Sequence, residues 1–428
     1  MSEPVRITLL WHRERAEGKD LAATVFRWFR GDPDDPGEVG RGLPVHYRCL
    51  PLEPATATDG SVSRGSSDPT PPGFHIAVPL VDEHLVVDPA CRAYLTDLAN
   101  GINRVGGLLV PVALAASAYQ LPFAVSRLNY LRLDRTLDPD HWGWEQRSRV
   151  RRERLISLLT QVVARELSAL SEPGALPKNH NQEPALPPPI KVFISHAKAD
   201  GVREAEALRS AILNRGQLQA FYDESDLPIG YAFEHLLNQA AVEGHGAETQ
   251  AMVVVFSDTY PSRPWCQREI RLARQPRQLG TGGAGARCWR VKPLVIVATL
   301  AGSETRMLSE AGQVPLIAWD PDRVGRIIDF LLREILLLRY NELRGLALLQ
   351  TEDANPDLGR HAINCLPDVY SAIEIAKSVA ATGSALTELL IPPPGISHDD
   401  RERIGRLIST GADPVRITTF DEAELQIP

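Results

Sequence analysis

Two side chains near the middle of the sequence have the types and spacing of a nucleotide site. Trp265 and Glu269 are four residues apart in a segment with apolar residues at helical spacing, so they share one face of the predicted helix. An aromatic ring beside a carboxylate, at the mouth of a parallel sheet, is suited to hold a nucleotide and to act on it. This pair predicts a catalytic site for a nucleotide.

Polar residues at the end of a predicted strand add to this site. The run KVFISHA (191–197) is apolar until Ser195 and His196, and Lys198 follows one residue later. These three residues are candidates for contacts to a diphosphate or a ribose. Cys266 is a weaker candidate for a nucleophile, because no histidine and acid partners are visible at a suitable spacing.

The elements around these residues alternate between strands and helices. We expect strands at 191–197, 218–223, 251–257, 291–300 and 314–319. We expect helices at 200–216, 231–244, 265–275 and 324–345. Such alternation predicts a parallel sheet that is covered by helices on both faces.

Three motifs in this segment resemble the Toll/interleukin-1 receptor (TIR) domain family. VFISHAKAD is similar to the family's first strand and its polar tip, and FYDESDLPIG is similar to the second strand and the so-called BB loop. VVVFSDTYPSRPWCQREI is similar to the later strand, its loop and the Trp-Cys-x-x-Glu helix. The resemblance implies a flavodoxin-like parallel-sheet domain at residues 191–345.

The same resemblance implies an activity. The family includes enzymes that cleave NAD+ at the nicotinamide–ribose bond, in which the Glu of this motif is catalytic, and signalling scaffolds that act through TIR–TIR assembly. For this chain it implies a bacterial NAD+ glycohydrolase in antiphage defence, with catalytic Glu269, NAD+ as substrate, no other cofactor and no metal. The residues expected to contact NAD+ are Phe193, Ser195, Lys198, Asp223, Phe233 and Trp265. Self-association through TIR domains and a nucleotide or protein trigger are the other expected partners.

Alternative interpretations of three of these residues stay open on the sequence alone. Glu269 could be a surface residue of its helix that pairs with Arg268 or Arg271. Trp265 could fill the core instead of stacking on a base, and Phe233 has apolar spacing that suits a core position equally well. The acidic turn Asp223, Glu224 and Asp226 is interpreted as a solvated loop, because no further metal ligands follow at regular spacing.

Two further regions flank this segment. Residues 171–190 form a Pro-rich linker, and residues 1–170 repeat the strand and helix pattern of 191–345. When DPACRAYL (88–95) is laid on RPWCQREI (263–270), Cys91 matches Cys266, but Ala90 and Tyr94 stand in the places of Trp265 and Glu269. We therefore interpret residues 1–170 as a degenerate TIR-like copy. Residues 346–428 predict a small α/β region without motifs, with strands at 362–366, 386–392 and 415–420 and helices at 369–382 and 397–410.

Composition limits the remaining classes of function. The net charge of −8 argues against a nucleic-acid-binding surface, and the basic run RSRVRRER (147–154) is expected on the solvated face of a helix. Five scattered cysteines without a C-x-x-C pair argue against a disulfide framework or zinc site and favour a reducing compartment. The longest apolar run (106–125) contains Pro111, Gln120 and Pro122, so we expect a buried strand and loop there, and a cytoplasmic protein without a membrane span.

Overall fold

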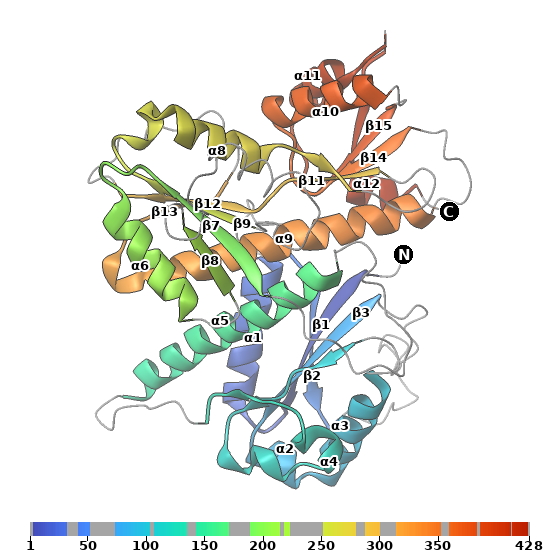
Figure 1. Cartoon of the computed structure of the whole chain (residues 1–428). Helices are drawn as coiled ribbons and strands as arrows, with labels where there is room; N and C mark the ends of the chain where they lie inside the picture. Colours follow the sequence, from blue (N-terminus) through green and yellow to red (C-terminus); the bar gives the residue numbers. More distant parts are fainter. Residues whose placement is uncertain are drawn as a thin grey trace. The chain divides into compact units, whose positions relative to one another are not determined.

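The computed structural model describes most of the chain (Figure 1). The described ranges are 3–31, 42–51, 73–102, 107–134, 143–170, 189–214, 218–222, 251–279, 287–299, 314–351, 359–382, 386–411 and 413–426. They form two compact units that divide within helix α5, after Leu159. Residues 171–188 of the linker predicted at 171–190 lie outside the described ranges, as do the acidic turn, the helix predicted at 231–244 and the glycine-rich run 280–286. The last residue predicted for the linker, Ile190, is the first residue of strand β7 (Ile190–His196).

The first unit is built on a parallel sheet of order β2-β1-β3-β5-β6, with the short strand β4 also paired to β3. Its strands are β1 (Val5–His12), β2 (Val45–Leu50), β3 (Phe74–Val81), β4 (Leu108–Leu109), β5 (Val112–Ala113) and β6 (Leu131–Arg132). Its helices are α1 (Ala16–Arg30), α2 (Glu83–Val87), α3 (Pro89–Ile102), α4 (Phe123–Ser126) and the first part of α5 (Trp144–Leu170), with a 3-10 turn at Ala116–Gln120.

Local sequence explains most of these boundaries. Helix α1 ends at Gly31, whose φ of 93° is a conformation that glycine adopts without strain. In the apolar run 106–125, where a buried strand and a loop were expected, two short strands flank Val110 and Pro111, because proline cannot donate a ladder hydrogen bond. Helix α5 begins at Trp144 and includes the basic run 147–154, in which Arg149 and Arg154 are exposed, while Arg151 is half-buried and pairs with Glu17 at 2.9 Å.

The second unit contains a sheet of order β13-β12-β9-β7-β8, in which every pair is parallel. Its strands are β7 (Ile190–His196), β8 (Leu218–Tyr222), β9 (Ala251–Phe256), β12 (Leu294–Ala298) and β13 (Leu316–Ala318). The helices around it are α6 (Val202–Leu213), α8 (Pro264–Arg274) and α9 (Val324–Thr351). All six residues of β9 are buried, as expected for a central strand covered on both faces.

The same unit contains a third sheet, of order β10-β11-β14-β15-β16. Its strands are β10 (Arg277–Gln278), β11 (Arg287–Arg290), β14 (Arg360–Ile363), β15 (Glu388–Ile391) and β16 (Arg416–Thr419), with helices α10 (Val369–Thr382), α11 (His398–Ile408) and α12 (Phe420–Glu424). Only β10 and β11 pair antiparallel. These two strands were not predicted, and they come from the segment between α8 and β12, so residues 346–428 supply only three of the five strands.

Helix α9 joins the second and third sheets. It is 28 residues long, and it contacts β9 and β12 of the second sheet and β11 and β14 of the third. Buried Glu342 of α9 accepts hydrogen bonds from Arg290 of β11, at 2.8 Å from Nε and 2.6 Å from Nη2. One helix therefore belongs to the cores of both sheets, as Figure 1 shows.

The predicted α/β class with parallel sheets is confirmed. When β4 and β5, which flank Val110 and Pro111, are counted as one strand, the first sheet has the same strand order as the second, with β2 or β8 at one edge and β6 or β13 at the other. Among the described helices, none is both long and apolar enough to cross a membrane. The five cysteines form no disulfide, and four of them are buried.

Candidate active site

A buried cluster of Ser195, Tyr260 and Glu269 lies where β7 ends beside α8. Ser195 precedes the last residue of β7 and shares a strand face with Phe193, which packs in one apolar core with Cys266 and Ile270 of α8. The Ser195 hydroxyl donates a short hydrogen bond to Oε2 of Glu269 and lies 2.7 Å from the Tyr260 hydroxyl. The strand thus brings Ser195 to the carboxylate that α8 presents.

The direction of these hydrogen bonds follows from the burial of Tyr260. Burial, and then the charge of Glu269, raise the pKa of this fully buried phenol well above its ordinary value. Tyr260 therefore keeps its proton and donates to Ser195, because Ser195 uses its own proton for Glu269. The hydrogen bonds from Tyr260 to Ser195 and from Ser195 to Glu269 hold the negative charge of the Glu269 carboxylate in place. Hydrogen bonds to a charged acceptor are stronger than those to a neutral one.

The surroundings of Glu269 and Trp265 settle two alternatives that the sequence leaves open. Glu269 is only 8% exposed and bonds to the strand, so it is not a surface residue of its helix. Trp265 is 49% exposed, so it does not fill the core. The guanidinium of Arg268 lies 5.6 Å from the centre of its ring. An indole with a solvent-facing surface is thus available one turn before a buried carboxylate.

Asp200 fixes the loop that carries Tyr260. Its carboxylate accepts hydrogen bonds from the Ser257 hydroxyl at 2.5 Å, the Thr259 hydroxyl at 2.6 Å and the Thr259 backbone N–H at 3.0 Å. Burial opposes ionisation of Asp200, but these hydrogen bonds outweigh it and lower the pKa of the carboxyl. Asp200 follows the end of β7 and Ser257 follows the end of β9, so the acid clamps two strand ends together.

The other predicted contact residues fall into three groups. Phe193 is a core residue, with its side chain packed against the inner face of α8. Lys198 is exposed just after the strand, beyond buried His196. Asp223 and Phe233 lie outside the described residues. Within the described part, Ser195 is thus the predicted residue that meets Glu269.

A comparison with known families agrees with this geometry. Residues 192–284 match the family described as TIR domain. The chain contains a TIR domain. The match begins within β7 and includes β9, α8 and β10, and hence all three members of the buried cluster. No curated protein matches the chain.

Sequence reasoning missed Tyr260 and Asp200 in the TIR domain. Tyr260 lies in the loop SDTYPSRP between β9 and α8, where only its distance of nine residues from Glu269 connects the two. Asp200 lies in a turn that was predicted as the start of a helix. The usable signal was Ser257 and Thr259 after a buried strand, since hydroxyls at such a position often pair with a nearby carboxylate.

The far end of α8 is anchored in the third sheet's region. Buried Arg274 lies 3.7 Å from Asp368, and the Gln275 side chain donates to Glu374 of α10 at 3.2 Å. The chain then passes directly into β10, the edge strand of the third sheet. Helix α8 is therefore held at one end by the TIR sheet and at the other by the third sheet.

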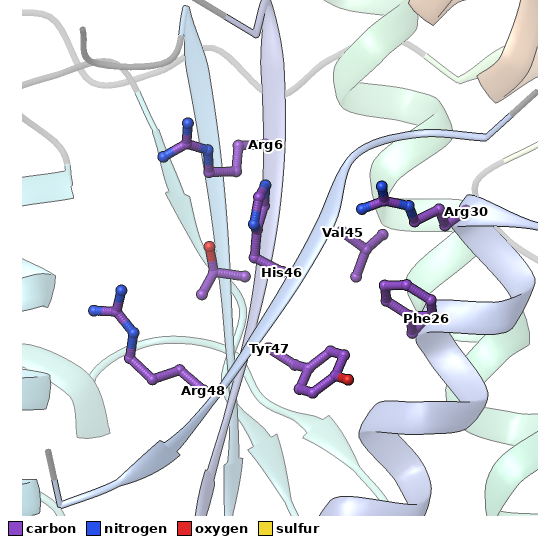
Figure 2. A pocket seen from close by; sticks show the side chains of 8 residues that line it. Arg6, Phe26, Arg30, Val45, His46, Tyr47 and Arg48 are labelled. Atoms are coloured by element: carbon purple, nitrogen blue, oxygen red, sulfur yellow. The ribbon is translucent and has the colours of Figure 1, made fainter. Parts of the chain in front are cut away.

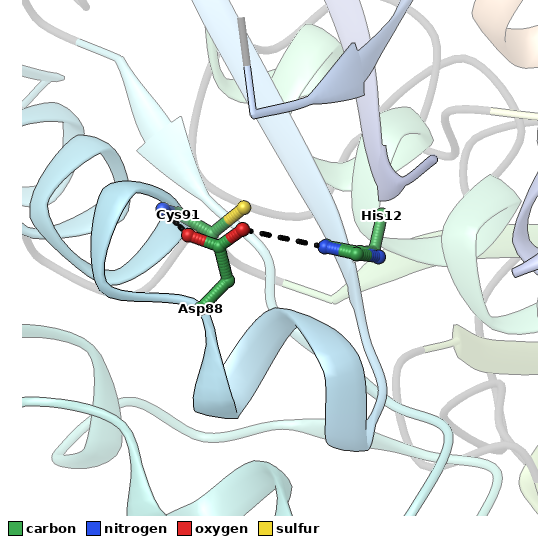
Figure 3. Close-up of side chains that lie close together, drawn as sticks. All are labelled: His12, Asp88 and Cys91. Carbon is green, nitrogen blue, oxygen red and sulfur yellow. Dashed lines mark hydrogen bonds and ion pairs between the residues drawn. The ribbon is translucent and has the colours of Figure 1, made fainter. Parts of the chain in front are cut away.

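The first sheet carries a different cluster at the equivalent place (Figure 3). His12, the last residue of β1, lies 3.5 Å from Asp88, and the ligand atoms of His12, Asp88 and Cys91 all lie within 4.8 Å of one another. These residue types can bind metals, but the backbone N–H of Glu14 donates to Nδ1 of His12. The neutral ring then carries its proton on Nε2, toward Asp88, which favours a histidine–carboxylate pair over a metal site.

Proposed function

We propose that the TIR domain is an NAD+ glycohydrolase with Glu269 as its catalytic residue. One observation supports this proposal above the others: a carboxylate held by Ser195 and Tyr260 lies one helical turn from a half-exposed tryptophan. In the proposed reaction the bond between the nicotinamide nitrogen and ribose C1′ breaks, and its electron pair leaves with nicotinamide. Water adds to C1′, so that NAD+ and water give nicotinamide, ADP-ribose and a proton.

The chemistry suits the groups that the chain provides. Nicotinamide leaves as a neutral molecule from a cationic one, so the step needs no strong acid. The ribose left behind carries positive charge. The Glu269 carboxylate stabilises this charge directly or holds the hydroxyls of the ribose. Trp265 provides a flat surface for the nicotinamide or adenine ring. Attack by a hydroxyl of the same molecule instead of water would give a cyclic isomer.

The rest of the proposal concerns the setting. We propose that TIR domains of neighbouring chains assemble to complete the site, and that the enzyme acts in bacterial antiphage defence in the cytoplasm. Five free thiols support a reducing compartment. We also propose that the first unit is a degenerate TIR-like copy, supported by a strand order that matches that of the second sheet when β4 and β5 count as one strand, and by Tyr94 at the place of Glu269.

The test measures nicotinamide release from NAD+ by the full chain, over a range of protein concentrations. Glu269→Gln keeps the shape of the side chain and removes its charge, and Glu206→Gln on the exposed face of α6 is the matched control. We expect release by the wild type and by Glu206→Gln, and none by Glu269→Gln. Equal release by Glu269→Gln, with unchanged thermal stability, would show that another residue carries the chemistry.

A second candidate function is a non-catalytic signalling scaffold. The observation that favours it is the burial of Glu269, because a carboxylate that is 8% exposed and bonded to Ser195 can serve packing alone. The scaffold predicts that the wild type releases no nicotinamide even where light scattering shows that it assembles. It also predicts that Glu269→Gln alters stability and nothing else.

A further inference from the structure

A basic cavity lies at the edge of the first sheet, in the unit that does not contain Glu269. It has a volume of about 360 Å³ and is bounded by β1, β2 and α1 (Figure 2). Four of its lining residues are basic and two are aromatic: Arg6, Arg30, His46, Arg48, Phe26 and Tyr47. No carboxylate lines the cavity among the described residues, although the whole chain has a net charge of −8. A local excess of positive charge in an acidic protein selects anions.

The charges nearby show how strong this excess is. Hydrogen bonds from His46 and, after the opposing effect of burial, from Arg6 lower the pKa of Glu3 to about 2. Burial and then the charges of Arg6 and His46 lower the pKa of His75 to about 4. Glu3 neutralises part of the charge of Arg6 and lies 3.3 Å from Nε2 of His46. Within the described ranges, neither Arg30 nor Arg48 has a carboxylate partner.

An aromatic surface lies beside these arginines. The Tyr47 ring is 57% exposed and is backed by Phe26, edge-on at 5.5 Å between ring centres, and by Trp11 at 5.8 Å. The Arg30 guanidinium lies 5.5 Å from the centre of the Phe26 ring. The rings of Phe26 and Trp11 thus hold the exposed Tyr47 ring in place. An exposed aromatic ring held in this way is suited to stack on a base.

Strand geometry decides how a ligand would lie in this cavity. Thr8 of β1 pairs in register with His46 of β2, so Arg6, Thr8, His46 and Arg48 lie on one face of the sheet. Tyr47 lies on the opposite face, with α1. Because β2 is an edge strand, the cavity follows this edge and reaches both faces. A matching ligand has anionic groups at one end and a planar ring at the other.

We propose that this cavity binds a nucleoside di- or triphosphate. Arg6, His46 and Arg48 would hold the phosphates on one face, Arg30 would supply charge on the other, and Tyr47 would stack on the base. The volume is at the lower end of the range for ligand sites, which fits one nucleotide better than a dinucleotide such as NAD+. The proposal stands independently of the TIR domain's activity.

Calorimetric titration of the full chain with ATP, adenosine and inorganic pyrophosphate tests this assignment. We expect ATP to bind, pyrophosphate to bind more weakly and adenosine to bind weakest. Arg48→Ala and Arg30→Ala should each weaken ATP binding about tenfold or more, because each removes a charge-assisted contact. Tyr47→Leu should weaken ATP binding and leave pyrophosphate binding unchanged. Arg127→Ala, an exposed arginine elsewhere in the same unit, should change nothing.

Three results would overturn the proposal. The first is no binding of ATP or pyrophosphate by the wild type, and the second is binding that Arg48→Ala and Arg30→Ala leave intact. The third is tighter binding of a single-stranded oligonucleotide than of ATP, with a salt dependence of several charges, which would assign a nucleic-acid surface instead. All four substituted side chains are exposed, and melting curves verify that the variants fold. ATP binding by Glu269→Gln at wild-type affinity would separate this cavity from the TIR site.

Discussion

The first and second sheets are both parallel and begin with the same order of their first three strands, but they differ at the ends of their first strands. In the TIR domain, Ser195, the residue before the end of β7, is bonded to a carboxylate in the second turn of α8. In the first sheet, β1 ends with His12 paired to Asp88, the residue before α3 begins. Tyr94 stands where α8 has Glu269, and it packs against the apolar core.

This difference shows that similar parallel sheets can carry different polar groups where their first strand ends. Both sheets hold a polar pair where the first strand meets a helix that begins with proline, so the topology provides the place. Whether this position can catalyse a reaction depends on which residue the helix presents there. The same holds for other folds, in which one architecture carries sites with many different functions. The predictions below test the contrast between the two sheets, in order of decreasing effect.

The largest expected effect separates Glu269 from Tyr94. If the proposed reaction holds, Glu269→Ala should lower the rate of nicotinamide release at least about a hundredfold, since it removes the charge that the proposal places beside the reacting ribose. Tyr94→Ala should leave that rate unchanged. Rates of the full-length variants at equal concentration decide the matter, and equal losses in both variants would abolish the contrast.

A smaller effect should follow from loss of the serine bridge. Ser195→Ala removes the hydroxyl that joins Tyr260 to Glu269, and a buried polar group that loses its partner costs about 1–3 kcal/mol. We expect faster hydrogen exchange in α8 and a rate of nicotinamide release about tenfold lower. His12→Ala should speed exchange in α3 and leave α8 unchanged. Unaltered exchange in α8 of Ser195→Ala would mean that the bridge has no positioning role.

The anchor of α8 gives the third prediction. Asp368→Asn removes the ion-pair partner of buried Arg274 and should lower the stability of α8 by about 1–2 kcal/mol, less than for a fully buried pair because Asp368 is 25% exposed. A double-mutant cycle with Arg274→Met measures the coupling by hydrogen exchange. Additive effects of the two substitutions would show that the pair does not hold the helix.

The smallest effect concerns acid stability, and it applies to both sheets. Burial raises the pKa of Asp88, but hydrogen bonds from the backbone N–H groups of Cys91 and Ala90 outweigh it and lower the pKa. Burial likewise raises the pKa of Asp200, but hydrogen bonds from Ser257 and Thr259 outweigh it and lower the pKa. Their stabilisation is present above the unfolded pKa of about 4 and is lost as pH falls through the lower folded pKa. Asp88→Asn and Asp200→Asn should each reduce the rise in melting temperature between about pH 2 and pH 5. A curve identical to that of the wild type would contradict the assignment for that residue.

Periodicity and strand composition were sufficient to predict most elements of the fold. Strand β9 is a run of buried apolar residues, and α8 has its apolar residues at helical spacing, so both were found from local pattern alone. The helical spacing in α8 also predicted correctly that Trp265 and Glu269 lie on one face of the helix. What the pattern could not decide was which residue of that face points inward, because this depends on Ser195, 74 residues earlier in the chain.

Strand β11 and the buried Tyr260 were missed because both depend on distant partners. Strand β11 has four residues, and it pairs with β14, more than 70 residues later. Within β11, buried Trp289 donates to His361 at 3.1 Å, a contact that no local spacing signals. Tyr260 was missed for the same reason, since its role comes from the strand end that it meets and not from its own loop.

Strands β10 and β11 also bear on how this gene can change during evolution. The TIR match ends at residue 284, between these two strands, whose remaining partners are encoded after α9. A recombination event that moved residues 346–428 elsewhere would leave Cys288 and Trp289 without the core that now covers them. The second and third sheets are therefore expected to be inherited, exchanged or lost together, as one genetic unit.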